Sequence, residues 1–221
     1  MDFIKSELHY YLREKQWHHA ITFCTSELKK GRDSYISFWR SFAHSQEGNL
    51  IEAIRDVEPL QDDPDFKYSS TVALLTYHNM YATPDTAKIN KLTSDEMSLE
   101  SSLTVPDTVN AMRFFTYLHD DEKFNDLNEK LSMMEQGEDS EELIVKGWKY
   151  AMENDEPNWT RAQGYFERYI KEYGNENIDA ILGGLKCLER MKKFETILDT
   201  YQEIIKMNSN FMPLHIERVK I

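Results

Sequence analysis

A triplet of residues recurs along the chain at a nearly constant interval. In each occurrence an aromatic or apolar residue is followed three positions later by a small or apolar residue. Four positions beyond that second residue stands another apolar one. The five full matches are Trp17-Ala20-Cys24, Leu50-Ala53-Val57, Phe124-Leu127-Leu131, Trp159-Ala162-Phe166 and Phe194-Ile197-Tyr201. Pro84-Ala87-Lys91 is a partial match. With it included, the middle residues lie 33, 34, 40, 35 and 35 positions apart. Spacings of three and four place side chains on one face of a helix, so the chain repeats a helical unit.

A period near 34 with an alanine-to-aromatic spacing in its second half is typical of tetratricopeptide repeats, each a pair of helices. It predicts an all-α, right-handed superhelix (an α-solenoid) of about six helix pairs plus the start of a seventh. The predicted repeats cover residues 1–33, 34–65, 66–104, 105–139, 140–175, 176–210 and 211–221. We expect a single solenoid over residues 1–221 that is the N-terminal part of a longer array, because no polar capping helix follows the seventh start.

Each repeat position has an expected packing role. Alanines in the triplets should let paired helices approach, and aromatic residues that open the second helix of a pair should fill the gap to the first. Gly147, Gly183 and Gly184 lie within predicted first helices, at positions where we expect a neighbouring helix to approach too closely for a larger side chain. The positions expected to define the repeats are Trp17, Ala20, Cys24, Gly48, Ala53, Val57, Phe124, Leu127, Leu131, Gly147, Trp159, Ala162, Phe166, Gly184, Phe194, Ile197 and Tyr201.

Two regions depart from the regular pattern. In the third repeat, residues 66–81 predict a helix, but residues 85–104 are only loosely patterned and Lys91 replaces an apolar residue. At the other end, Pro213 opens a seventh first helix, and we expect the apolar face of residues 214–219 to be open. Exposed partner-binding residues cannot be assigned from the pattern. Tyr35 and Trp39 could anchor a partner, but burial between repeats is the favoured interpretation.

Composition narrows the class of protein. Hydrophobic residues make up 40% of the chain and charged residues 29%, which is ordinary for a folded protein. Apolar runs such as residues 72–75 are far shorter than the ~18 residues of a membrane span, and no signal core opens the chain. We therefore expect a soluble, cytosolic protein. The formal net charge of −13 argues against nucleic acid or anionic membrane as main partners.

The sequence contains no catalytic motif that we can identify. It lacks a phosphate-binding glycine loop, a G-x-S-x-G elbow, H-E-x-x-H and C-x-x-C. His9, His18, His19 and Cys24 are the only hint of a metal site, and spacings of six and five from Cys24 suit one helix face poorly. Acidic clusters at residues 62–65, 120–122 and 138–142 fall at predicted turns. We predict no enzyme activity, metal or cofactor, and we expect Cys24 and Cys187 to be buried, unbridged thiols.

Three segments carry a resemblance beyond the repeat positions. They are YYLREKQWHHA at residues 10–20, EGNLIEAIR at residues 47–55 and LGGLKCLE at residues 182–189. Their residues, order and approximate positions resemble the N-terminal part of the tetratricopeptide repeat protein 21 family, which supplies the large all-repeat subunit of intraflagellar transport complex A. The region of residues 85–104 resembles the family least.

This resemblance implies a non-catalytic scaffold or adaptor that mediates protein–protein contacts in retrograde ciliary transport and in ciliary cargo entry. The implied partners are other intraflagellar transport subunits and adaptors of ciliary membrane-protein cargo, with no nucleic acid and no direct membrane insertion. The implied location is the cytoplasm and the cilium, at the axoneme and basal body region.

A second function remains open on the residues alone. Some tetratricopeptide repeat co-chaperones grip the carboxylate of a partner's C-terminus with Lys, Arg and Asn side chains that line their groove. Such a carboxylate clamp needs a basic, open groove, which a net charge of −13 disfavours. The two functions therefore predict different grooves. A clamp needs a groove that is basic and open, whereas a scaffold is expected to have one that is filled and acidic.

Overall fold

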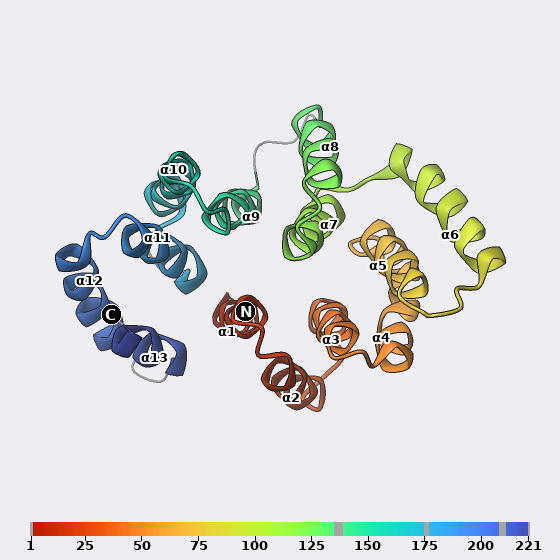
Figure 1. Ribbon diagram of the computed structural model, residues 1–221, viewed down its shortest axis with the longest axis horizontal. Coiled ribbons are helices and arrows are strands. Elements are labelled where there is room, and N and C mark those ends of the chain that lie inside the picture. Colours follow the sequence, from red (N-terminus) through yellow and green to blue (C-terminus); the bar gives the residue numbers. More distant parts are fainter. Residues whose placement is uncertain (1, 135–138, 175–176, 208–210, 221) are drawn as a thin grey trace. The chain divides into compact units, whose positions relative to one another are not determined.

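The computed structural model describes residues 2–134, 139–174, 177–207 and 211–220, and every regular element in these ranges is a helix (Figure 1). The α-helices are α1 (Asp2–Arg13), α2 (Trp17–Leu28), α3 (Ser34–Gln46), α4 (Leu50–Val57), α5 (Lys67–Asn79), α6 (Thr86–Leu99), α7 (Val105–Leu118), α8 (Asp121–Ser132), α9 (Ser140–Ala151), α10 (Glu156–Tyr173), α11 (Ile178–Arg190), α12 (Phe194–Met207) and α13 (Met212–Lys220). Short 3-10 helices, η1 (Glu58–Asp62) and η2 (Glu100–Ser102), follow α4 and α6.

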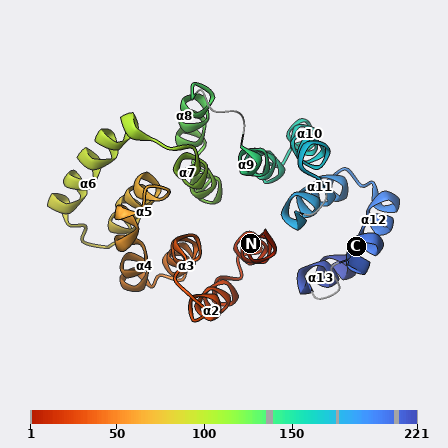
Figure 2. The ribbon, with the colours of Figure 1, turned by 180° about the vertical axis from the view of Figure 1, so that it is seen from behind.

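Successive helices pack in pairs (Figure 2). Contacts join α3 to α4, α5 to α6, α7 to α8, α9 to α10 and α11 to α12, and the odd-numbered helices begin at residues 2, 34, 67, 105, 140, 178 and 212. The predicted all-α class, with six helix pairs and the start of a seventh, is confirmed. The chain forms two compact units: residues 11–137 make one, and residues 1–10 with 138–221 make the other.

Local capping explains where several helices begin. Asp33 accepts a hydrogen bond from the Ile36 amide at the start of α3, and Asp120 accepts one from the Lys123 amide at the start of α8. Thr104 caps α7 and Pro106 lies in its first turn, where the missing amide hydrogen of proline costs no helix hydrogen bond. Between α3 and α4, Gly48 has φ of +82°, a left-handed conformation that glycine adopts without a Cβ clash.

The core of residues 11–137 is built from the repeat positions and from aromatic side chains of the first helices. Ala20 and Ala53 are fully buried, as expected for residues at which paired helices approach. The largest buried side chains of this unit are Phe38, Trp39, Phe42, Tyr77, Phe114, Phe115 and Phe124. In α6 the one buried residue is Leu92, while Ala87 and Lys91 are exposed. The loose pattern of the third repeat thus coincides with a helix that lies largely outside the core.

In the other unit, Phe166 occupies the centre of a cluster formed by α9, α10 and α11. Its ring is fully buried together with Ala162, one turn earlier on α10. A Cβ added at Gly147 or Gly183 would overlap this ring, whereas one added at Gly184 would lie 3.8 Å from the Phe166 Cβ, an ordinary contact. Close approach therefore occurs at Gly147 and Gly183 and not at Gly184, since adjacent residues point in directions about 100° apart around a helix.

One packing expectation is wrong and a second holds only in part. Phe194 was expected to fill the gap to the preceding helix but is 45% exposed; Ile197 and Tyr201 hold the buried positions of α12 instead. For the face of residues 214–219, predicted to be open, the outcome is mixed: Leu214 is fully buried, whereas Ile216 is 37% exposed and Val219 is 86% exposed. The reason is that α13 packs on α12 and also contacts the first helix of the chain.

Candidate interaction surfaces

The inner side of the unit of residues 11–137 is filled by rings from α3, α5 and α7. Phe38 and Phe42 lie 5.9 and 5.6 Å from Phe114, measured between ring centroids, and Trp39 lies 5.4 Å from Tyr117 in an edge-to-face arrangement. Trp39 is fully buried, which confirms the favoured interpretation for that residue over a role as an exposed partner anchor. This aromatic interior leaves no open groove between α3 and α7 at these residues.

The arginines of α3 and α7 are committed to internal partners. Arg113 donates through Nη1 to the hydroxyl of Tyr35 at 2.8 Å, and both side chains are at least half buried. Arg40 makes a two-pronged contact with Asp56 on α4: Nε donates to Oδ2 at 2.6 Å and Nη2 donates to Oδ1 at 2.8 Å. A carboxylate clamp needs cations that can face a ligand, and these two guanidinium groups already have acceptors.

Asp107 links α7 to the start of α5. Its carboxylate is buried and accepts hydrogen bonds from the amides of Tyr68 at 2.6 Å and Ser69 at 2.8 Å. The residue before α5 is Phe66, whose side chain cannot cap the helix. Asp107 therefore supplies the missing N-terminal cap from a different helix. Burial raises the pKa of the Asp107 carboxyl, and the two amide hydrogen bonds act in the opposite direction.

Sequence reasoning missed this cap. The available signal is that α5 lacks a Ser, Thr, Asp or Asn at the position before its first turn. That absence predicts an external acceptor but does not say which residue provides it.

A cavity of about 500 Å³ lies where the start of α3 meets the end of α4 and η1. Its charged lining comes from Arg32, Asp33, Arg55, Asp56, Asp62 and Asp63. Three of these six groups already have roles: Asp33 caps α3, Asp56 binds Arg40, and Asp63 accepts a hydrogen bond from the Ser34 hydroxyl at 2.5 Å. Within the acidic cluster of residues 62–65, Asp63 also accepts a hydrogen bond from the Asp65 amide at 3.0 Å, so its carboxylate holds the turn before α5 and links it to α3.

The histidines and cysteine considered as metal ligands do not form a site. Cys24 is fully buried, whereas His18 and His19 are exposed. Across the described ranges, no group of three or more His, Cys, Asp or Glu side chains could hold a metal ion. Burial raises the pKa of the Cys24 and Cys187 thiols to about 12 each, and both thiols are unbridged. Thiols in this state are poor nucleophiles and poor metal ligands.

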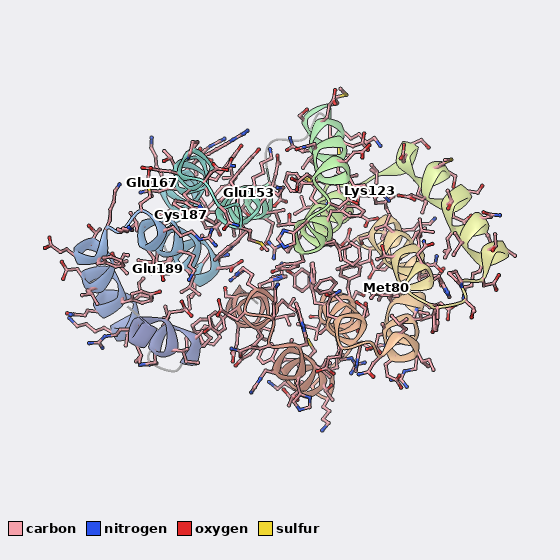
Figure 3. The ribbon with its side chains drawn as sticks, in the orientation of Figure 1. Met80, Lys123, Glu153, Glu167, Cys187 and Glu189 are labelled. Atoms are coloured by element: carbon pink, nitrogen blue, oxygen red, sulfur yellow. The ribbon has the colours of Figure 1, made fainter. Side chains whose placement is uncertain are left out.

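Ion pairs hold the loosely patterned helix α6 in place. Lys123 lies on α8 (Figure 3). Its Nζ is 3.0 Å from Oε1 of Glu96 on α6, and Lys130 Nζ is 3.1 Å from Oε2 of Glu100 at the start of η2. These contacts compensate in part for the single buried side chain of α6. They also occupy lysines that would otherwise be available to an acidic ligand.

Exposed apolar side chains mark the surfaces best suited to protein partners. The large ones are Phe3, Ile51, Met80, Met97, Met133, Tyr173, Phe194, Leu198, Ile216 and Val219. Phe194 and Leu198 are four residues apart on α12, so they share a face of that helix. No helix of the described ranges is long and apolar enough to cross a membrane.

Comparison with known proteins identifies the family. The family described as "Tetratricopeptide repeat protein 21 N-terminal ARM repeat" matches residues 8–221, which is nearly the whole chain. The chain belongs to this family. Its description calls the repeats ARM repeats, whereas the period near 34 predicted tetratricopeptide repeats. Both are α-solenoid units that bury their apolar faces by stacking.

Individual relatives agree with the family assignment. The chain is 26% identical over 219 residues to tetratricopeptide repeat protein 21B of Mus musculus and 20% identical over 214 residues to tetratricopeptide repeat protein 21A of Homo sapiens. It is 24% identical over 215 residues to the tetratricopeptide repeat protein 21 homolog of Caenorhabditis briggsae. These matches cover 96–99% of this chain and 16% of each relative's length.

Proposed function

We propose that this chain is a non-catalytic scaffold segment of an intraflagellar transport complex A assembly. It would mediate protein–protein contacts in retrograde ciliary transport and in the entry of ciliary cargo. The observation that carries the proposal is membership of the tetratricopeptide repeat protein 21 family over residues 8–221. Its partners would be other intraflagellar transport subunits and adaptors of membrane-protein cargo, in the cytoplasm and at the axoneme and basal body region of the cilium.

Two features of the structure support a scaffold over a carboxylate clamp. The inner rings of α3 and α7 fill the space that a clamp would keep open, and Arg40 and Arg113 bind acceptors of this chain. The exposed apolar side chains lie instead on several helices, among them the pair Phe194 and Leu198 on α12. A scaffold that meets partners through its outer surface needs this kind of arrangement.

The test is a pull-down from a lysate of ciliated cells at physiological salt, quantified by mass spectrometry. The bait is the 221-residue chain, and the readout is enrichment of intraflagellar transport complex A subunits over an unrelated helical repeat protein. The variant Phe194→Ser/Leu198→Ser removes the exposed apolar pair, and Ile51→Ser, at a site that is 71% exposed, is the matched control. Enrichment of the complex with the unaltered chain supports the proposal; enrichment of chaperones without it contradicts the proposal.

The clamp is tested separately with purified protein. A fluorescent acidic peptide that ends in a free carboxylate is titrated with the chain, and the same peptide with an amidated C-terminus is the control. Binding that requires the free carboxylate would favour the co-chaperone function. Equal and weak binding of both peptides would favour the scaffold.

A further inference from the structure

The first helix of the chain contacts the last one within the unit of residues 1–10 and 138–221. The hydroxyl of Tyr10 on α1 donates a hydrogen bond to Oε1 of Glu217 on α13 at 3.0 Å, and both side chains are buried. The rings of Phe3 and Phe211 meet edge to face, 4.7 Å apart between centroids. These two contacts join residues 3–10 of α1 to Glu217 on α13 and to Phe211, the residue directly before α13.

A third contact extends the same segment to α9. Lys5 Nζ lies 3.5 Å from Oε1 of Glu141, at the start of that helix. Helices in a solenoid normally contact only their neighbours along the chain. Here a buried hydrogen bond joins residues 207 positions apart. The repeat period does not require such a contact, so it depends on particular side chains.

The last three residues of α1 belong to the other compact unit. Tyr11, directly after Tyr10, stacks on His19 with 6.0 Å between ring centroids. The boundary between the two compact units therefore falls within α1, between Tyr10 and Tyr11. Between Phe3 and Tyr10, the side chains of Ser6, Leu8 and His9 are also buried, so residues 3–10 pack into their unit along most of their length.

We propose that residues 3–10 act as a strap that holds α13 on the rest of its unit. With the strap closed, Phe211 is fully buried against Phe3. With the strap released, the Phe211 ring loses its edge-to-face partner and the Glu217 carboxylate loses a hydrogen-bond donor in a buried position. Both changes favour detachment of α13, which makes the strap a conformational control over access to the Phe211 side of that helix.

Hydrogen exchange of backbone amides in the full chain tests the strap. Tyr10→Phe removes the donor to Glu217 and keeps the ring. We expect the protection of the α13 amides to fall about ten- to a hundredfold, the range for a hydrogen bond to a charged group, while the amides of α3 to α8 keep their protection. Tyr11→Phe is the matched control, because it makes the same change at the next residue and should leave α13 unaffected.

A double-mutant cycle shows whether the effect of Tyr10→Phe on the exchange of α13 amides acts through Glu217. Glu217→Leu removes the acceptor, so Tyr10→Phe should change α13 exchange much less in that background than in the unaltered chain. Fully additive effects would overturn the proposal. So would unchanged α13 protection in Tyr10→Phe, or an equal loss of protection in every helix. Because these experiments use purified chain alone, their outcome does not depend on the proposed transport function.

Discussion

The ring of Phe166 packs directly against the backbone of Gly147, so that a Cβ at position 147 would lie 2.6 Å from Cε1 of the ring. A Cβ at Gly183 on α11 would overlap Cζ and Cε1 of the same ring, which is fully buried. Three helices thus meet at one aromatic side chain. This arrangement is possible because two glycines on separate helices leave room for the ring.

Alanine substitutions at Gly183 and Gly184 should separate the effect of packing on stability from the effect of helix propensity. Gly183→Ala should destabilise the protein by about 1–3 kcal/mol, because its Cβ overlaps a buried ring that has no space to move. Gly184→Ala, next along the helix, should be neutral or stabilise by up to about 1 kcal/mol, the gain in helix propensity. Urea unfolding measures both. Equal stability of the two variants would contradict this description of the Phe166 contact.

Removal of the external cap of α5 should cost more than removal of a local cap. Asp107→Ala leaves two buried amides of Tyr68 and Ser69 without their acceptor, and we expect a loss of about 2–4 kcal/mol. Asp85→Ala removes the exposed cap of α6 and should cost about 0.5–1 kcal/mol. Thermal unfolding of the two variants compares them. A smaller effect for Asp107→Ala than for Asp85→Ala would show that α5 finds another acceptor.

The partly buried ion pair between Arg40 and Asp56 should be sensitive to loss of one partner. Arg40→Ala leaves a carboxylate whose side chain is 6% exposed without its main partner, which we expect to cost about 3–5 kcal/mol. Arg55→Ala removes a neighbouring, well-exposed arginine and should change stability by less than about 1 kcal/mol. If Arg40→Ala/Asp56→Leu proves no more stable than Arg40→Ala, the unpaired charge is not the source of the loss.

The lowered pKa values of two histidines predict how the stability of the protein depends on pH. Burial lowers the pKa of His44 and of His78 below the ordinary value of 6.5. Below pH 6.5 the unfolded chain therefore binds more protons than the folded chain, and the free energy of unfolding should fall as pH decreases from 7 towards 5. Urea unfolding at intervals across that range measures the slope. His44→Gln/His78→Gln should flatten it; an unchanged slope would assign the effect to other groups.

The helix pairs could be predicted because their signal is local. Residues three and four apart share a helix face, so Trp159, Ala162 and Phe166 reveal a buried stripe without any knowledge of its neighbours. The same reasoning found residues 85–104 only loosely patterned, which agrees with the single buried residue of α6. It was wrong for Phe194, because the period marks a position on the helix but does not show whether a neighbouring helix covers it.

The amino-acid sequence by itself determined the class of fold, the position of the helices and the family, since all three depend on spacing and on short segments of residues. Only the tertiary structure decided that Asp107 caps α5, that Phe166 lies between Gly147 and Gly183, and that Tyr10 binds Glu217. These contacts join residues between 17 and 207 positions apart. A repeat period describes how each helix meets its neighbours, and it contains no information on which distant side chains the packed helices bring together.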